Sequence, residues 1–89
     1  MEFGFIVGLS YAAKYVLKYA ITNLLNTGFK RRNIKRISRL SDKKVSKALQ
    51  KLKEYGLITY DRGTKEWYLS DTVRIGSDII LSKLVDITL

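Results

Sequence analysis

The chain has 89 residues, the length of one small domain, and carries 17 lysines and arginines against 8 acids, a formal charge of +9. It contains no cysteine and no histidine, which excludes disulfides and thiolate metal sites and removes the commonest general base. We therefore treat 1–89 as a single domain and expect no metal and no cofactor. The positive charge predicts a polyanionic partner, either DNA, RNA or an anionic membrane surface.

The opening run 1–9 is apolar, but its pattern is not that of a membrane or targeting segment. Its one charge, Glu2, is acidic and the lysines follow it, which is the reverse of a secretory signal. Lys14 and Lys18 interrupt the apolar stretch before it reaches the roughly 20 residues that a bilayer requires. The sequence therefore predicts an intracellular protein with no membrane partner.

Residues 10–27 have the apolar spacing of a helix. Ser10 is a suitable N-cap, and Gly28 suits the left-handed position after a last helical turn. The apolar positions recur three and four residues apart: Ala13, Val16, Leu17, Ala20, Ile21, Leu24 and Leu25. The connector 29–32 is short and has room for a minimal strand.

Two further helices are predicted in close succession. Asn33 caps a helix over 34–40, whose shared apolar face is Ile34, Ile37 and Leu40. Ser41 caps a helix over 42–55, whose predicted buried stripe is Val45, Ala48, Leu49 and Leu52. Gly56 stands where helices commonly end on glycine.

Residues 57–60 and 66–69 are rich in β-branched and aromatic residues and predict two strands of a hairpin. In the turn 61–65 we expect a positive φ at Gly63. Alternation predicts one face with Ile58 and Tyr60 and another with Trp67 and Leu69. Because neighbouring residues point to opposite faces, only one of Trp67 and Tyr68 can be buried.

A last helix is predicted over 71–88, capped by Ser70 or Asp71. Gly76 weakens its first turns, so the regular helix can begin near Ser77. Val73 is one of its apolar positions, and the others exceed what a small core needs: Ile79, Ile80, Leu84, Val85 and Ile87. With the tyrosines of the first helix (Tyr11, Tyr15 and Tyr19), they predict a homodimer interface. The alternative is that the last helix packs on the first helix of its own chain.

Residues 33–70 read NIKRISRLSDKKVSKALQKLKEYGLITYDRGTKEWYLS, in which VSKALQKLKEYGLI joins a basic helix through a glycine to a strand. This stretch resembles the winged helix-turn-helix family of transcriptional regulators. The resemblance implies a mainly α fold in the order helix, short strand, helix, helix, two-stranded wing and C-terminal helix. It implies double-stranded DNA as the partner, with 42–55 as recognition helix in the major groove and 61–65 as wing. The turn Leu40-Ser41-Asp42 lacks the glycine often found there, which affects the expected crossing angle.

When the apolar stripe of 42–55 faces inward, the opposite face is polar and basic. Its candidate base contacts are Lys43, Ser46, Lys47 and Gln50. Lysine can donate to guanine acceptors and glutamine can pair with adenine. A solvated structural face is the alternative, but such a face would interleave acids, because like charges one turn apart repel.

The positive charge is concentrated in one part of the chain. Eleven of the 17 cations lie between Lys30 and Lys53, with Asp42 as the single acid, whereas the two signs nearly balance elsewhere. The candidate phosphate contacts are Arg31, Arg32, Lys35, Arg36, Arg39, Lys44 and Lys51. At the wing, Arg62 and Lys65 either reach an adjacent minor groove or are the solvated end of an ordinary hairpin.

We therefore expect a cytoplasmic, nucleoid-associated DNA-binding protein that regulates transcription. Two alternatives stay open: a protein-interaction winged-helix module, which tends to lose the basic face, and a nonspecific chromatin or RNA-binding protein, which the lysine content allows. An enzyme is not expected, since the serines have no histidine partner and the eight acids are scattered singly.

Overall fold

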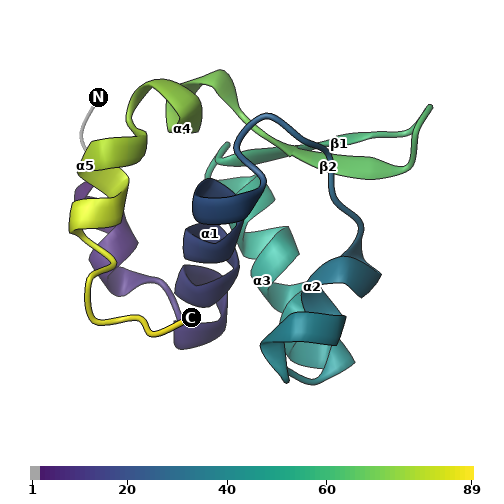
Figure 1. The fold of residues 1–89 in the computed structure, drawn as a ribbon, viewed down its shortest axis with the longest axis horizontal. Helices are drawn as coiled ribbons and strands as arrows, with labels where there is room; N and C mark the ends of the chain where they lie inside the picture. The colour runs from purple at the N-terminus through teal and green to yellow at the C-terminus, as the bar shows by residue number, and fades with distance from the viewer. Residues whose placement is uncertain (1–2) are drawn as a thin grey trace.

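The computed structural model describes residues 3–89, and this part of the chain is mainly helical with one small antiparallel sheet, as predicted (Figure 1). A 3-10 helix, η1 (Gly4–Gly8), precedes five α-helices and two strands. In chain order these are α1 (Tyr11–Asn23), α2 (Arg31–Ser38), α3 (Asp42–Glu54), β1 (Ile58–Asp61), β2 (Glu66–Leu69), α4 (Asp71–Ile75) and α5 (Ser77–Ser82).

Helix α1 begins as predicted and ends earlier. The Ser10 hydroxyl oxygen accepts a hydrogen bond from the Ala13 N–H at 3.2 Å, so the predicted N-cap is confirmed. The helix ends at Asn23 instead of residue 27, because Leu24 leaves helical geometry with a φ of −133°. Leu24 and Leu25 continue the apolar spacing as half-buried loop residues, and for this reason the spacing predicted a helix that is too long.

Gly28 has a role different from the predicted one. It is not among the residues with positive φ, so the predicted left-handed helix end is wrong. A Cβ atom on Gly28 would lie 2.7 Å from Cζ of Tyr68, inside contact distance. A side chain at this position would therefore have to displace the Tyr68 ring, which lies directly against the Gly28 backbone.

Helix α2 begins at Arg31, so the predicted helix over 34–40 is displaced. Asn33 is the third residue of this helix and not its N-cap; its Oδ1 accepts a hydrogen bond from the Lys30 N–H at 2.9 Å. The helix ends at Ser38 because Arg39 adopts the left-handed conformation, with a φ of 58°. Ile34 is buried, whereas Ile37 is exposed, so the predicted apolar face is only partly confirmed.

The turn between α2 and α3 works without glycine because Arg39 occupies the left-handed position that glycine would fill. The Ser41 hydroxyl oxygen then accepts from the Lys44 N–H at 3.2 Å, which confirms the N-cap of α3. The helix ends at Glu54, one residue before the predicted end, and Gly56 has a φ of 72°, as its position predicted.

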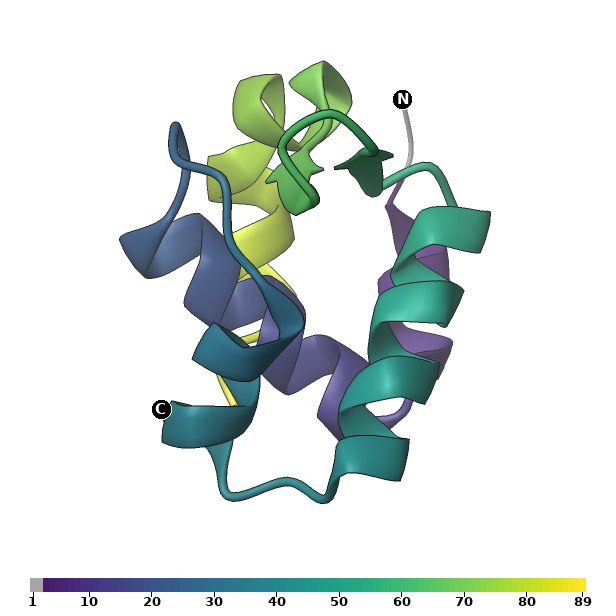
Figure 2. The same ribbon diagram turned by 90° about the vertical axis from the view of Figure 1, so that its right-hand side faces the viewer.

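Helix α1 lies against α3 on one side and α5 on another, and together they enclose the core (Figures 1 and 2). The predicted stripe of α3 is confirmed: Val45, Ala48, Leu49 and Leu52 are all buried. Residues 3–9 add to this core through Phe3, Ile6 and Leu9. Residues 3–9 of the apolar opening run therefore contribute to the folded core.

The hairpin pairs Ile58 with Leu69 and Tyr60 with Trp67. Residues that face each other across an antiparallel pair point to the same side, so these four side chains share one face and the two-face prediction is wrong. Trp67 and Tyr68 are both half-buried, so neither side chain of the pair is fully buried. The positive φ in the turn belongs to Lys65, at 60°, and not to Gly63.

Phe29 forms the predicted minimal strand. Its N–H donates to the Trp67 carbonyl at 2.9 Å, and the Trp67 N–H donates to the Phe29 carbonyl at 2.7 Å. The Phe29 side chain is buried. This isolated bridge ties the connector between α1 and α2 to the hairpin.

The predicted helix over 71–88 is two short helices that break at Gly76, followed by non-helical residues 83–89. A Cβ atom on Gly76 would lie 2.7 Å from the Phe3 ring, so the break coincides with close packing of the opening segment. Lys18 Nζ donates to the carbonyls of Leu84, at 3.0 Å, and Ile87. The C-terminal segment thus packs on the first helix of its own chain.

This packing leaves part of the C-terminal segment uncovered. Ile80, Leu84 and Ile87 are buried, whereas Ile75 is 88% exposed and Val85 is 77% exposed.

Within residues 3–89, every helix is too short or not apolar enough to reach across a bilayer.

Candidate nucleic-acid interface

The exposed face of α3 carries the four predicted base contacts. Lys43, Ser46, Lys47 and Gln50 are all exposed on this helix; Lys43, Lys47 and Gln50 lie opposite its buried stripe, and Ser46 flanks them on one edge. Thirteen residues of regular helix with a capped first turn hold these side chains at fixed spacing. The prediction that the polar side of this helix is exposed is therefore confirmed for these residues.

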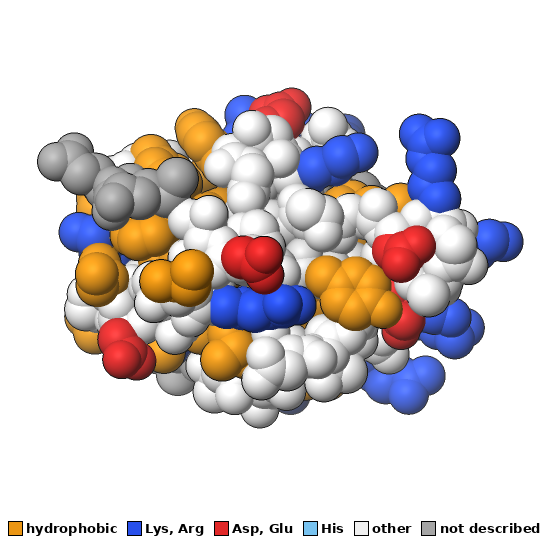
Figure 3. Space-filling model, turned by 90° about the horizontal axis from the view of Figure 1, so that it is seen from above, with side chains coloured by type: hydrophobic (Ala, Val, Ile, Leu, Met, Phe, Trp, Pro, Cys, Tyr) orange, Lys and Arg blue, Asp and Glu red, His pale blue; other side chains and the backbone are white. Residues whose placement is uncertain are grey.

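Most of the predicted phosphate and wing residues are also exposed. On α2 and the following turn, Arg31, Arg32, Arg36 and Arg39 are exposed and Lys35 is half-buried; on α3 and the hairpin, Lys44, Lys51, Arg62 and Lys65 are exposed. Figure 3 shows lysine and arginine side chains gathering at the hairpin end of the molecule, away from α4 and α5. The predicted phosphate and wing contacts on α2, α3 and the hairpin are therefore nearly all accessible to solvent.

Two of the predicted phosphate contacts have acidic partners. Arg31 Nη1 lies 3.4 Å from Asp42 Oδ1, and Lys51 Nζ lies 3.4 Å from Glu54 Oε2. Both pairs are solvent-exposed, so each contributes little to stability and can open to another anion. Sequence reasoning missed the first pair because α2 begins three residues earlier than predicted, which brings Arg31 to the first turn of α3.

The two edges of α3 face different neighbours. Asp42, Ser46 and Lys53 lie within about 40° of one another on the helix, and the Arg31–Asp42 contact puts the first turn of α2 beside this edge. Lys44 and Lys51 lie on the other edge, where two surface hollows separate α3 from η1 and the start of α1. The predicted phosphate contacts are thus divided between both edges of the helix.

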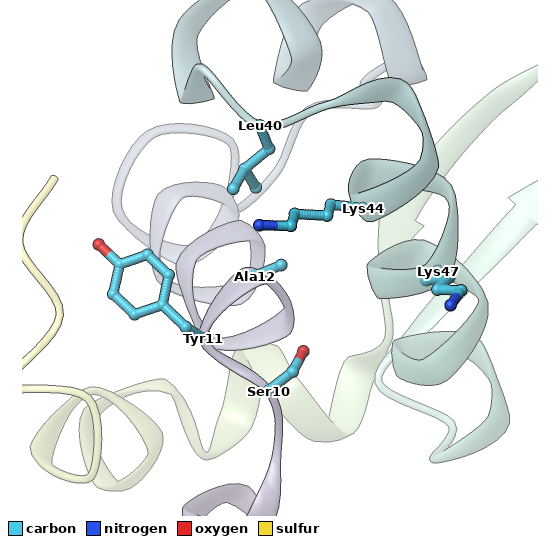
Figure 4. A pocket seen from close by; sticks show the side chains of 6 residues that line it. All are labelled: Ser10, Tyr11, Ala12, Leu40, Lys44 and Lys47. Atoms are coloured by element: carbon cyan, nitrogen blue, oxygen red, sulfur yellow. The ribbon is translucent and has the colours of Figure 1, made fainter.

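Figure 4 shows the hollow at the first turns of α3 from close by. Lys44 reaches from α3 toward α1, with its ammonium group between Leu40 and Ala12, whereas Lys47 points outward. The hollow has a volume of about 290 Å³, and its neighbour, of about 320 Å³, shares Ser10 and Lys47 with it. Residues 8–11 therefore border the lysine edge of α3, and the sequence pattern carries no sign of this long-range contact.

Both non-glycine residues of positive φ within 3–89 are cations of this region, Arg39 and Lys65. Left-handed geometry costs a residue with a Cβ roughly 1 kcal/mol relative to glycine. Both side chains leave sharp turns into solvent, one between α2 and α3 and one at the end of the hairpin.

The residues that the structure describes contain no group of three or more histidine, cysteine, aspartate or glutamate side chains able to hold a metal ion. Comparison of the chain with family models, curated proteins and solved structures gives no match. The interface is therefore interpreted from its own geometry and charge.

Proposed function

We propose that this chain is a winged helix-turn-helix protein that binds double-stranded DNA and regulates transcription. Helix α3 enters the major groove, α2 lies across the backbone, and the turn 61–65 reaches the minor groove or the backbone beside it. The order of elements supports this proposal: α1, the Phe29 bridge, α2, α3 and a hairpin succeed one another as in the family that 33–70 resembles.

The distribution of charge is the observation that carries the proposal. Between Lys30 and Lys53 the chain has eleven cations and one acid, and nearly all of these cations are exposed on α2, α3 and the turn between them. Like charges one helical turn apart cost a few tenths of a kcal/mol per pair in the free protein. A polyanion removes this repulsion and gains counterion release when it binds.

The exposed face of α3 has the chemistry of a base reader. Lys43 and Lys47 carry ammonium donors for guanine O6 and N7, and Gln50 carries both a donor and an acceptor for adenine. The cations of α2 supply phosphate contacts that set orientation without reading sequence. Lysine is a less selective base reader than arginine, so we expect modest sequence preference.

Selection of bound duplexes from a randomised pool tests the proposal. We expect a preferred site that binds tighter than a random duplex, with Lys47→Ala weakening the preferred site by about tenfold and the random duplex less. Lys83→Ala is the matched control, because Lys83 lies at the end of α5, outside the basic stretch. Equal loss on both duplexes would remove Lys47 from base reading, and a pool with no retained duplex would overturn DNA binding itself.

A further inference from the structure

The lysine edge of α3 borders an apolar surface, and this combination differs from the polar face proposed to read DNA. Ala12 and Leu40 line the first hollow, with Lys44 reaching over them (Figure 4). Leu9 and Tyr55 line the second, with Lys47 and Lys51 at its rim. Leu9 is buried and Tyr55 is half-exposed, its ring stacked on Phe5 at a centroid distance of 4.9 Å.

The charged side chains that line the two hollows are all lysines. Glu54 is paired with Lys51, and no carboxylate within residues 3–89 is paired with Lys44 or Lys47. The Ser10 hydroxyl, which borders both hollows, already accepts the Ala13 N–H as a helix cap. The Lys44 ammonium group is therefore the charged contact that lies over the first hollow, whereas Lys47 stands at its border and points outward.

We propose that these hollows bind a small amphipathic anion, a carboxylate with an aromatic or alkyl body. The carboxylate pairs with Lys44, while the apolar body covers Ala12 and Leu40. Charge complementarity selects the anion, since the charged residues of the first hollow's lining are both lysines, and the apolar lining selects the body. Volumes of about 290 and 320 Å³ suit a small ligand, at the lower end of ligand pockets.

Binding in this place has a consequence for the proposed DNA contact. Lys44 lies over the first hollow, is exposed on α3 and is also one of the predicted phosphate contacts. A ligand that holds its ammonium group competes with DNA for the same cation. The hollows are thus placed to make duplex binding respond to an anionic effector; this consequence rests on the proposed function, whereas the binding of the anion does not.

The test uses 1-naphthoate as probe, with amide chemical shifts of the full chain as readout. We expect saturable shifts centred on Ser10, Ala12 and Leu40. Two comparison ligands separate the contributions: 1-naphthalenemethanol keeps the aromatic body without charge, and acetate keeps the charge without the body. Both should bind more weakly than 1-naphthoate at these residues.

Paired variants sharpen the result. Lys44→Gln should weaken 1-naphthoate about three- to fivefold, as expected for loss of one exposed ion pair, whereas Lys43→Gln, one residue away on α3 and outside both hollows, should change binding less than twofold. Equal binding of the neutral analogue, shifts centred on Ile75 and Ile79, or no saturable shifts would each overturn the proposal. Displacement of duplex by 1-naphthoate tests the effector role separately, so a failure of DNA binding leaves the ligand result readable.

Discussion

The two ends of this molecule present opposite surfaces on one core. At the hairpin end, α2, α3 and the turn 61–65 expose lysines and arginines, and the buried stripe of α3 supports them. At the other end, α4, α5 and the segment after them expose Ile75, Ile79 and Val85, which are 88%, 55% and 77% accessible. The comparison shows that the exposed cations and the exposed apolar residues are not part of the buried core, so the core does not account for either set.

The ends also differ in how they are held. Helix α3 has 13 residues with a capped first turn, whereas α4 and α5 have 5 and 6 residues and depend on tertiary contacts. Lys18 binds the C-terminal carbonyls, and Arg74 Nε donates to the Leu25 carbonyl at 3.2 Å. The regular end therefore holds its exposed side chains through local helix structure, whereas the apolar end is held by contacts with residues distant in sequence.

The largest expected effect concerns the shared core. Leu52→Ala in α3 and Ile80→Ala in α5 each remove a fully buried side chain and should lower the free energy of unfolding by about 2–5 kcal/mol. Thermal melts followed by the single tryptophan and by helical circular dichroism should coincide in both variants. Two separate transitions would show that the ends fold as independent units.

The next effect concerns the apolar end. We expect sedimentation to show a homodimer held through α4 and α5, with Ile79→Ser raising its dissociation constant about tenfold. Ile37→Ser on α2, also an exposed isoleucine, is the control and should leave the dimer intact. A wild-type chain that stays monomeric at high micromolar concentration would refute this interface.

A matched pair of aspartates compares the ends directly. Asp42 and Asp71 are each the first residue of a helix and each pair with an arginine, at 3.4 and 3.3 Å. Asp42→Asn should tighten duplex binding about threefold to tenfold at low salt, since it frees Arg31 and removes the one acid of the basic stretch. Asp71→Asn, with the same charge change, should alter binding less than twofold; equal effects would mean that only net charge matters.

The smallest effect concerns the turn between α2 and α3. Arg39→Gly relieves a φ of 58° and should raise the free energy of unfolding by up to about 1 kcal/mol. The same variant should weaken duplex binding and reduce the salt slope by about 0.9, because one phosphate contact is lost. A more stable variant with unchanged DNA affinity would limit Arg39 to a structural role.

The sequence predicted some elements of this fold well, and the physical reason is local. The α3 stripe, the Ser41 cap, Gly56 and strand β2 follow from periodicity and backbone chemistry within a few residues. The predicted start of α2 was wrong because the Asn33 side chain caps the helix from its third residue. The predicted end of α1 was too late because Leu24 and Leu25 pack against the core from a loop.

The remaining differences depend on contacts between residues distant in sequence. The rings of Tyr68 and Phe3 lie close against the backbone of Gly28 and Gly76, where a side chain would clash with them. The hollows beside Lys44 and Lys47 arise where η1 and α1 approach α3. No local pattern encodes such approaches. For the candidate site, the sequence therefore predicted which side chains are exposed on α3, but not that they face two different neighbours.

The most direct test of the central claim is fluorescence-anisotropy titration of a random-sequence duplex at several salt concentrations. If Arg32, Lys35, Arg36, Arg39 and Lys44 contact phosphates, the logarithm of the association constant should fall with the logarithm of salt at a slope of about −4.5. Such a slope would support the phosphate-directed basic face. Absence of binding even at low salt would contradict it and turn attention to a protein partner for α3.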